Sequence, residues 1–114
     1  MLRKGHIVLF EFPHADQRSG KLRPALIIKR CPGQYNDWLI CMISSQLHQQ
    51  LPGIDEVVTQ TSHDFNQTGL KLSSVIRITR LAIVKENIIK GTIGSISSDR
   101  HALICTRLCE WLSA

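Results

Sequence analysis

The sequence predicts a mainly β domain of the α+β class, in which a small antiparallel barrel is followed by a C-terminal helix. Several short segments are rich in aliphatic and β-branched residues and are separated by polar or Pro/Gly-containing loops, as antiparallel strands usually are. The C-terminal segment instead places its apolar residues at helical spacing. Short strands joined by long loops, with one terminal helix, favour a small barrel.

Three strands are predicted in the first half of the chain. Residues 6–12 (HIVLFEF) are rich in β-forming residues, and a polar loop follows. Residues 24–30 (PALIIKR) begin with a proline, which has no amide hydrogen and should mark the first residue of a strand or an edge. Arg23 precedes this proline and is therefore held in extended backbone at the mouth of the strand. Residues 38–44 (WLICMIS) are almost continuously apolar, which predicts a central strand buried on both faces.

The second half continues with strands and ends in a helix. Residues 54–60 (IDEVVTQ) read as a strand and 61–69 as a loop. Residues 73–84 (SSVIRITRLAIV) alternate apolar and polar side chains, which fits a half-exposed strand pair. One helical turn is expected over 85–90, and a last short strand over 91–97.

The C-terminus predicts an amphipathic helix that lies on the sheet. Ser97 or Ser98 can cap it, and Asp99 in the first turn suits the helix dipole. Four apolar residues fall on one face at i, i+4, i+7 and i+8: Ile104, Leu108, Trp111 and Leu112. Trp111 is therefore expected in the core, and Trp38 is also expected to be packed.

Length and composition indicate one soluble domain over residues 1–114. The longest apolar runs, such as ALII and WLICMI, are far shorter than the roughly 20 residues that span a bilayer, so we expect a cytoplasmic protein without a membrane partner. Fourteen Lys and Arg against nine Asp and Glu give a net charge of +5 and a pI of about 9.3. Such a balance is compatible with a polyanionic partner.

The four cysteines do not form a recognisable metal motif. Cys105 and Cys109 lie one helical turn apart and could share a zinc ion with Cys31 and Cys41, but the spacing matches no finger or knuckle. Each cysteine has apolar neighbours, among which a thiol behaves as a small hydrophobic group. We therefore expect reduced thiols, no metal and no cofactor.

Three blocks of sequence occur in a specific order. They are KGHIVLFEFPHAD…GKLRPALII, then ICMISSQ, then GLKLSSVIRITRLAIVKENIIKGTIGSIS. Together they resemble the MazF/PemK family of toxin endoribonucleases, the toxin half of toxin–antitoxin pairs, over nearly the whole chain. The resemblance implies an SH3-like barrel of the MazF/CcdB type that works as a homodimer. It also implies growth inhibition by metal-independent, sequence-specific cleavage of single-stranded RNA, neutralisation by a cognate antitoxin, and operator DNA binding by the toxin–antitoxin complex.

The resemblance also implies site residues. Arg23 matches the Arg of the family's Arg-Pro motif, and Ser44 matches the Thr or Ser that closes the next strand; both belong to the catalytic centre. Arg77 matches an Arg that some PemK-like members use in catalysis. In that branch an Asp two residues later serves as the general base, and here Thr79 takes its place. The residues expected to bind substrate are Lys21, Pro24, Ser45, Gln46 and Thr79.

RNA cleavage without a metal needs a base for the ribose 2′-hydroxyl, cations for the charge on the phosphorane, and a proton for the leaving 5′-oxygen. The planar guanidinium groups of Arg23 and Arg77 match two phosphate oxygens at once. The Ser44 hydroxyl can donate to a non-bridging oxygen. The candidate proton carriers are His14 and Asp16 in the first loop and Glu11 just before it, and His14 suits the role because a histidine titrates near neutral pH. The expected products carry a 2′,3′-cyclic phosphate and a 5′-hydroxyl.

Structural roles compete with these catalytic ones. Arg23 could clamp a carboxylate within its own fold, Ser44 could be an ordinary strand residue, and Arg77 could belong to a solvated face. His14 and Asp16 could be solvated loop residues. Two other functions also compete: a non-catalytic toxin of the same fold that acts on a topoisomerase, and a nucleic-acid-binding SH3-like barrel. The Arg-Pro motif counts against the former, and the order of the three blocks counts against the latter.

Overall fold

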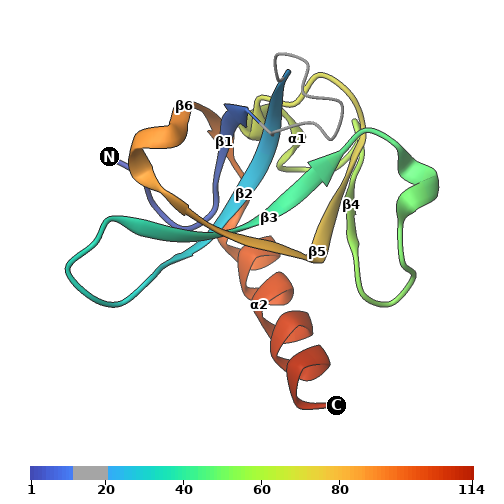
Figure 1. Ribbon diagram of the computed structural model, residues 1–114. Coiled ribbons are helices and arrows are strands. Elements are labelled where there is room, and N and C mark those ends of the chain that lie inside the picture. The colour runs from blue at the N-terminus through green and yellow to red at the C-terminus, as the bar shows by residue number, and fades with distance from the viewer. Residues whose placement is uncertain (12–20) are drawn as a thin grey trace.

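The computed structural model describes residues 1–11 and 21–114. Six strands form one antiparallel sheet in the order β4-β5-β3-β2-β1-β6, with a long helix at the C-terminus (Figure 1). The elements are β1 (His6–Glu11), β2 (Leu22–Arg30), β3 (Asp37–Ser44), η1 (Leu47–Gln49), β4 (Glu56–Val58), α1 (Phe65–Thr68), β5 (Ser74–Lys85), η2 (Glu86–Ile88), β6 (Ile89–Ser95) and α2 (Ser98–Ser113).

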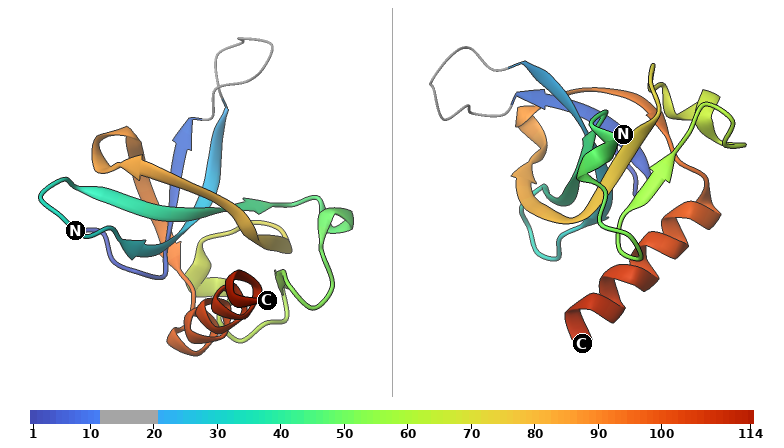
Figure 2. Two further views of the ribbon diagram at one scale, coloured as in Figure 1. Left: turned by 60° about the horizontal axis from the view of Figure 1, so that its bottom comes forward. Right: turned by 90° about the vertical axis from the view of Figure 1, so that its right-hand side faces the viewer.

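The predicted fold class is confirmed: the chain is mainly β, antiparallel, with a C-terminal helix. The sheet is curved but is not closed into a barrel, because β4 and β6 are its two edges (Figure 2). α1 packs against β6 so closely that a Cβ added at Gly94 would overlap the backbone of Gln67 and Thr68. Gly69, which ends α1 with a φ of +72°, would overlap the backbone of Ile93 in the same way.

The sheet has an apolar cluster on each face, because alternate residues of a strand point to opposite sides. The helix-side core contains Ile7, Leu26, Ile28, Cys41, Ile43, Val58, Ile76, Ile78, Ile96, Ile104 and Leu108. The second core contains Val8, Phe10, Ala25, Ile27, Trp38, Ile40 and Val84. β3 contributes to both clusters, which confirms the prediction of a central strand buried on both faces.

Residues 73–84 were predicted to be a strand pair, but residues 74–84 instead lie in the single strand β5, which has an irregularity at 78–80. Met42 pairs with Arg77, whereas the preceding residue, Cys41, pairs with Leu81, so three residues of β5 fall between these pairs. The amide of Ile78 donates to Oδ1 of the buried Asp55 at 3.0 Å. This break in the ladder interrupts the alternation, which is why the sequence pattern resembled two strands.

α2 begins where the sequence predicted, with the Ser97 hydroxyl accepting from the Arg100 amide at 3.2 Å. Ile104 and Leu108 of the predicted apolar face are buried. The expectation that Trp111 belongs to the core is wrong: its side chain is 44% exposed. Figures 1 and 2 show the reason, since the last turns of α2 extend beyond the strands.

Ion pairs that the sequence analysis did not predict attach α2 to the rest of the fold. Arg100 donates Nε and Nη2 to the two carboxylate oxygens of Asp64 at 2.9 and 3.0 Å, and Nη1 to Glu56 at 2.7 Å. Arg107 donates to the other oxygen of Glu56 at 2.6 Å. Burial of Asp64 acts to raise its pKa, but the hydrogen bonds from Arg100 and from the Ser97 amide outweigh it and lower the pKa to about 2.

Candidate active site

A cavity of about 280 Å³ lies where β2 and β3 part. The β1–β2 ladder continues to Leu22, whereas the β2–β3 ladder reaches only to the Ala25–Met42 pair. The residue beyond that pair is Pro24, which has no amide hydrogen for a further rung. Pro24 was predicted to begin a strand or lie on an edge; it instead lies inside β2, an interior strand, at the point where one of the two ladders ends. The cavity is lined by Lys21, Leu22, Arg23, Pro24, Ile43, Ser44, Ser45, Gln46, Leu70, Lys71, Leu72 and Ser74.

Arg23 stands at the wall that β2 contributes to this cavity. It is exposed and lies opposite Phe10 of β1. Among residues 1–11 and 21–114, no carboxylate forms an ion pair with Arg23. The described part of the chain therefore offers no partner for the intramolecular clamp, and the guanidinium is accessible to a ligand.

Ser44 closes β3 on the opposite wall. Its Oγ accepts the amide N–H of Gln46 at 3.0 Å, which fixes the chain as it leaves the strand. A hydroxyl that accepts one hydrogen bond keeps its own hydrogen for another acceptor. Ser45 and Gln46 are exposed and line the cavity with it.

The third wall is the segment that leads into β5, and it adds a cation that sequence reasoning missed. Lys71 is exposed and lines the cavity together with Lys21 and Arg23, while none of the described lining residues is acidic. The Ser74 hydroxyl donates to the carbonyl of Leu72 at 2.8 Å and so holds this wall in place. A lone lysine in a loop has no motif, and only the pairing of β5 with β3 brings it to the cavity.

Arg77 and Thr79 do not line the cavity. Arg77 shares the sheet face of Ser44, because Val75 pairs with Ser44 and Arg77 with Met42, two residues along each strand. It therefore lies about 7 Å further along the sheet, and its Nε is buried without a hydrogen-bond partner in the described residues. Thr79 falls within the irregularity of β5.

The remaining predicted site residues fall into two groups, those at the cavity and those outside the described part of the chain. Lys21, Arg23, Pro24, Ser44, Ser45 and Gln46 meet at one cavity. His14 and Asp16 lie outside the described residues. Nothing in the described ranges groups three His, Cys, Asp or Glu side chains as a metal site would, and all four cysteines are free thiols. Burial raises the pKa of the Cys41 thiol, so this group is a neutral core residue.

A curved antiparallel sheet with a C-terminal helix and a cation-lined cavity at the strand ends defines a small β domain of the MazF/PemK type. The chain belongs to the family of PemK-like, MazF-like toxins of type II toxin–antitoxin systems, whose family model matches residues 3–112. Membership implies a cognate antitoxin as partner. No curated protein matches the chain. The helices of the described residues are all too short or too polar to cross a membrane.

Proposed function

We propose that this toxin is an endoribonuclease that cleaves single-stranded RNA without a metal ion. The observation that carries the proposal is the joint position of Arg23 and Ser44, the matches to the family's catalytic motif, on facing walls of one cavity. Lys21 and Lys71 line the same cavity, and no described carboxylate there competes for them. An RNA phosphate is the ligand that such a set of donors and positive charges suits.

Each residue that lines the cavity then has a role that its position allows. Attack of the ribose 2′-oxygen on phosphorus breaks the bond to the 5′-oxygen, which leaves a 2′,3′-cyclic phosphate and a 5′-hydroxyl. Arg23 holds two phosphate oxygens and stabilises the charge that grows on them, and Ser44 donates its hydroxyl hydrogen to a non-bridging oxygen. Lys21 and Lys71 attract the neighbouring phosphates. His14 and Asp16 are the proposed carriers of the proton from the 2′-hydroxyl to the 5′-oxygen.

Arg77 has a supporting role in this proposal. Its Nε has no described partner and Met42, with which it pairs, lies two residues before Ser44. Both observations support a role for its guanidinium in holding a phosphate on the adjoining part of the sheet. Thr79 cannot replace a carboxylate as general base, because a threonine hydroxyl does not ionise in this pH range. We therefore assign the proton transfer to the first loop and not to β5.

The partners follow from the same proposal. We infer that residues 1–114 form one toxin domain, that it acts as a cytoplasmic homodimer, and that its complex with the antitoxin binds operator DNA. The net charge of +5 supports a polyanionic substrate and an acidic inhibitor.

The test is cleavage of single-stranded RNA by purified protein in excess EDTA. We expect cleavage to persist and the products to carry cyclic phosphate ends. Arg23→Ala should lower the rate by about 100-fold or more, and Arg23→Lys should recover only part of it. Arg30→Ala is the matched control, because Arg30 lies at the other end of β2 and bonds Asn36.

Two outcomes would contradict the proposal. One is a loss of cleavage in EDTA that a divalent ion restores. The other is an Arg23→Ala variant that cleaves as fast as Arg30→Ala while both keep their melting temperature. Growth inhibition without RNA cleavage would instead support the non-catalytic toxin, and RNA binding without either effect would support the binding module.

A further inference from the structure

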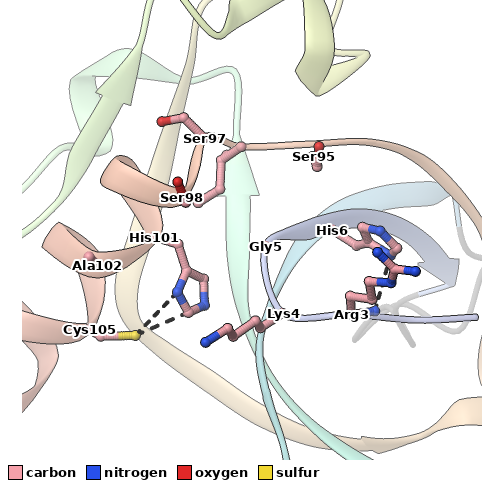
Figure 3. A pocket seen from close by; sticks show the side chains of 11 residues that line it. Arg3, Lys4, Gly5, His6, Ser95, Ser97, Ser98, His101, Ala102 and Cys105 are labelled. Carbon is pink, nitrogen blue, oxygen red and sulfur yellow. Dashed lines mark hydrogen bonds between the residues drawn. The ribbon is translucent and has the colours of Figure 1, made fainter.

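A second and larger cavity, of about 590 Å³, lies at the start of β1. It is formed between the N-terminal turn at residues 3–6 and the beginning of α2 (Figure 3). The candidate active site is at the other end of β1, where Glu11 pairs with Leu22 next to Arg23. The six residues of β1 separate the two cavities by about 20 Å.

The N-terminal turn is a fixed part of the fold. The amide of His6 donates to the carbonyl of Arg3 at 3.1 Å, and the amide of Arg3 donates to Nδ1 of His6 at 3.2 Å. The bond from the His6 amide to the Arg3 carbonyl closes a four-residue β-turn over residues 3–6. Gly5 is the third residue of this turn and has the positive φ, +89°, that a type II turn requires there. Gly5 also forms hydrogen bonds to the chain on both sides. Its amide donates to the carbonyl of Ile27, and its carbonyl accepts from the amide of Ile96. The backbone of Arg3 and the adjacent Lys4 is thus held in place, and both side chains are exposed at the cavity.

These two cations have no counter-ion in the described part of the chain. Neither Arg3 nor Lys4 forms an ion pair there, and no described lining residue is acidic. Asp99 lies in the first turn of α2 but does not line the cavity. The pKa of His6 is lowered by burial and by the positive charges of Arg3 and the N-terminus. The cavity therefore holds unbalanced positive charge.

The opposite wall supplies hydrogen-bonding groups. Figure 3 shows Lys4 directed toward His101 and Cys105, with Ser97 and Ser98 above them at the start of α2. The His101 ring is fixed by a 2.8 Å hydrogen bond between Nε2 and the carbonyl of Ile28. The hydroxyls of Ser97 and Ser98 can each donate one hydrogen bond.

We propose that this cavity binds a phosphate group, separate from the candidate active site. A phosphate has up to two negative charges and three acceptor oxygens, which suits two adjacent cations on one wall and hydroxyl donors on the other. A carboxylate has one charge and one plane, and would leave part of this set unused. The volume exceeds that of a bare phosphate and lies in the range of small-ligand sites, so the cavity has room for a nucleotide that carries the phosphate. That nucleotide is either free or the flanking residue of a bound RNA.

The experiment follows backbone amide resonances by NMR while inorganic phosphate, adenosine 5′-monophosphate or adenosine is added at constant ionic strength. We expect phosphate and the monophosphate to shift residues 3–6 and 95–102 in a saturable way, and adenosine to leave them unchanged. The Arg3→Gln/Lys4→Gln variant should bind the monophosphate at least tenfold more weakly. Lys85→Gln/Lys90→Gln, which removes the same charge from exposed positions elsewhere, should bind within twofold of the parent.

A second arm separates the two sources of the phosphate. Uncleavable 2′-O-methyl RNAs of two and about twelve nucleotides are compared. At about 3.4 Å per nucleotide along a strand, the twelve-nucleotide RNA can span about 20 Å and the dinucleotide cannot. A flanking-RNA site predicts that the longer RNA alone loses affinity in Arg3→Gln/Lys4→Gln. A free-nucleotide site predicts that neither RNA loses affinity in this variant. This arm depends on RNA binding, but the monophosphate titration does not depend on the proposed function.

The proposal is overturned by non-saturable shifts, by equal effects of phosphate and adenosine, or by equal affinities in the two double variants. Thermal unfolding of both variants shows that the fold is intact. Shifts confined to the residues around Arg23 and Lys71 would also overturn it, because the phosphate would then bind only at the candidate active site.

Discussion

Arg100→Ala is expected to be the most damaging single substitution on α2. The change leaves the carboxylate of Asp64 fully buried without its two guanidinium hydrogen bonds, and removes one of the two cations on Glu56. Breaking a buried ion pair from one side costs about 3–5 kcal/mol of unfolding free energy. For a domain of this size the melting temperature should fall by roughly 10–20 °C. Arg107→Ala, whose side chain is partly exposed, should cost only about 1 kcal/mol.

The pH dependence gives this prediction its sharper form. The folded pKa of Asp64 is about 2 against an ordinary value of 3.8, which corresponds to a stabilisation on the order of 2 kcal/mol. Because the folded pKa is the lower one, this stabilisation is complete above about pH 4 and is lost as the pH falls from about 4 to about 2. In Arg100→Ala, burial should raise the pKa of Asp64 instead. That variant should therefore become more stable, relative to the parent, as the pH falls from 7 toward 4.

Urea unfolding from pH 7 to pH 3 measures both effects. Adding Asp64→Asn to Arg100→Ala should recover part of the lost stability at pH 7, since the amide is neutral. A loss below about 1 kcal/mol in Arg100→Ala, together with a pH profile parallel to that of the parent, would refute this account of how α2 is attached.

Three further outcomes are expected. Gly94→Ala should destabilise the fold by about 3 kcal/mol, because a Cβ there meets the backbone at the end of α1, whereas Gly91→Ala on the same strand has open space and should cost less than about 1 kcal/mol; equal melting temperatures would contradict this. Light scattering should give twice the monomer mass of 12.9 kDa at micromolar concentration, and a mass near 12.9 kDa would exclude the homodimer. An acidic peptide from the antitoxin should compete with uncleavable RNA and bind more weakly as salt rises, so simultaneous binding at the candidate active site would end that inference.

Most of the fold could be predicted because its signals are local. A run of β-forming residues predicts β1, an almost continuous apolar run predicts β3, and a serine cap with apolar residues at helical spacing predicts α2. The sequence pattern failed to predict the features that depend on contacts between residues far apart in the chain. α1 has only four residues and is held by close packing on β6, which no short window of sequence reveals. Trp111 fits the apolar face of α2, but the sheet ends before the helix does.

Only those residues of the candidate site that belong to a sequence motif could be predicted. Arg23 and Ser44 stand at strand ends that a short motif marks, and they do line one cavity. Lys71 carries no motif and reaches the cavity through strand pairing alone. The placement of Arg77 depends on the exact register of β3 and β5, and that register is changed by a side chain, Asp55, more than twenty residues away.

The irregularity at 78–80 also has a consequence for how this fold can vary. The pairs on its two sides, Met42 with Arg77 and Cys41 with Leu81, are not in one continuous register. A lengthened or shortened β2–β3 hairpin therefore changes the alignment of β3 with β5 only on the hairpin side of this point. The opposition of Ser44 and Val75 is preserved. We therefore expect that a change in the length of the loop between β2 and β3 leaves the arrangement of Ser44 and Arg77 unchanged.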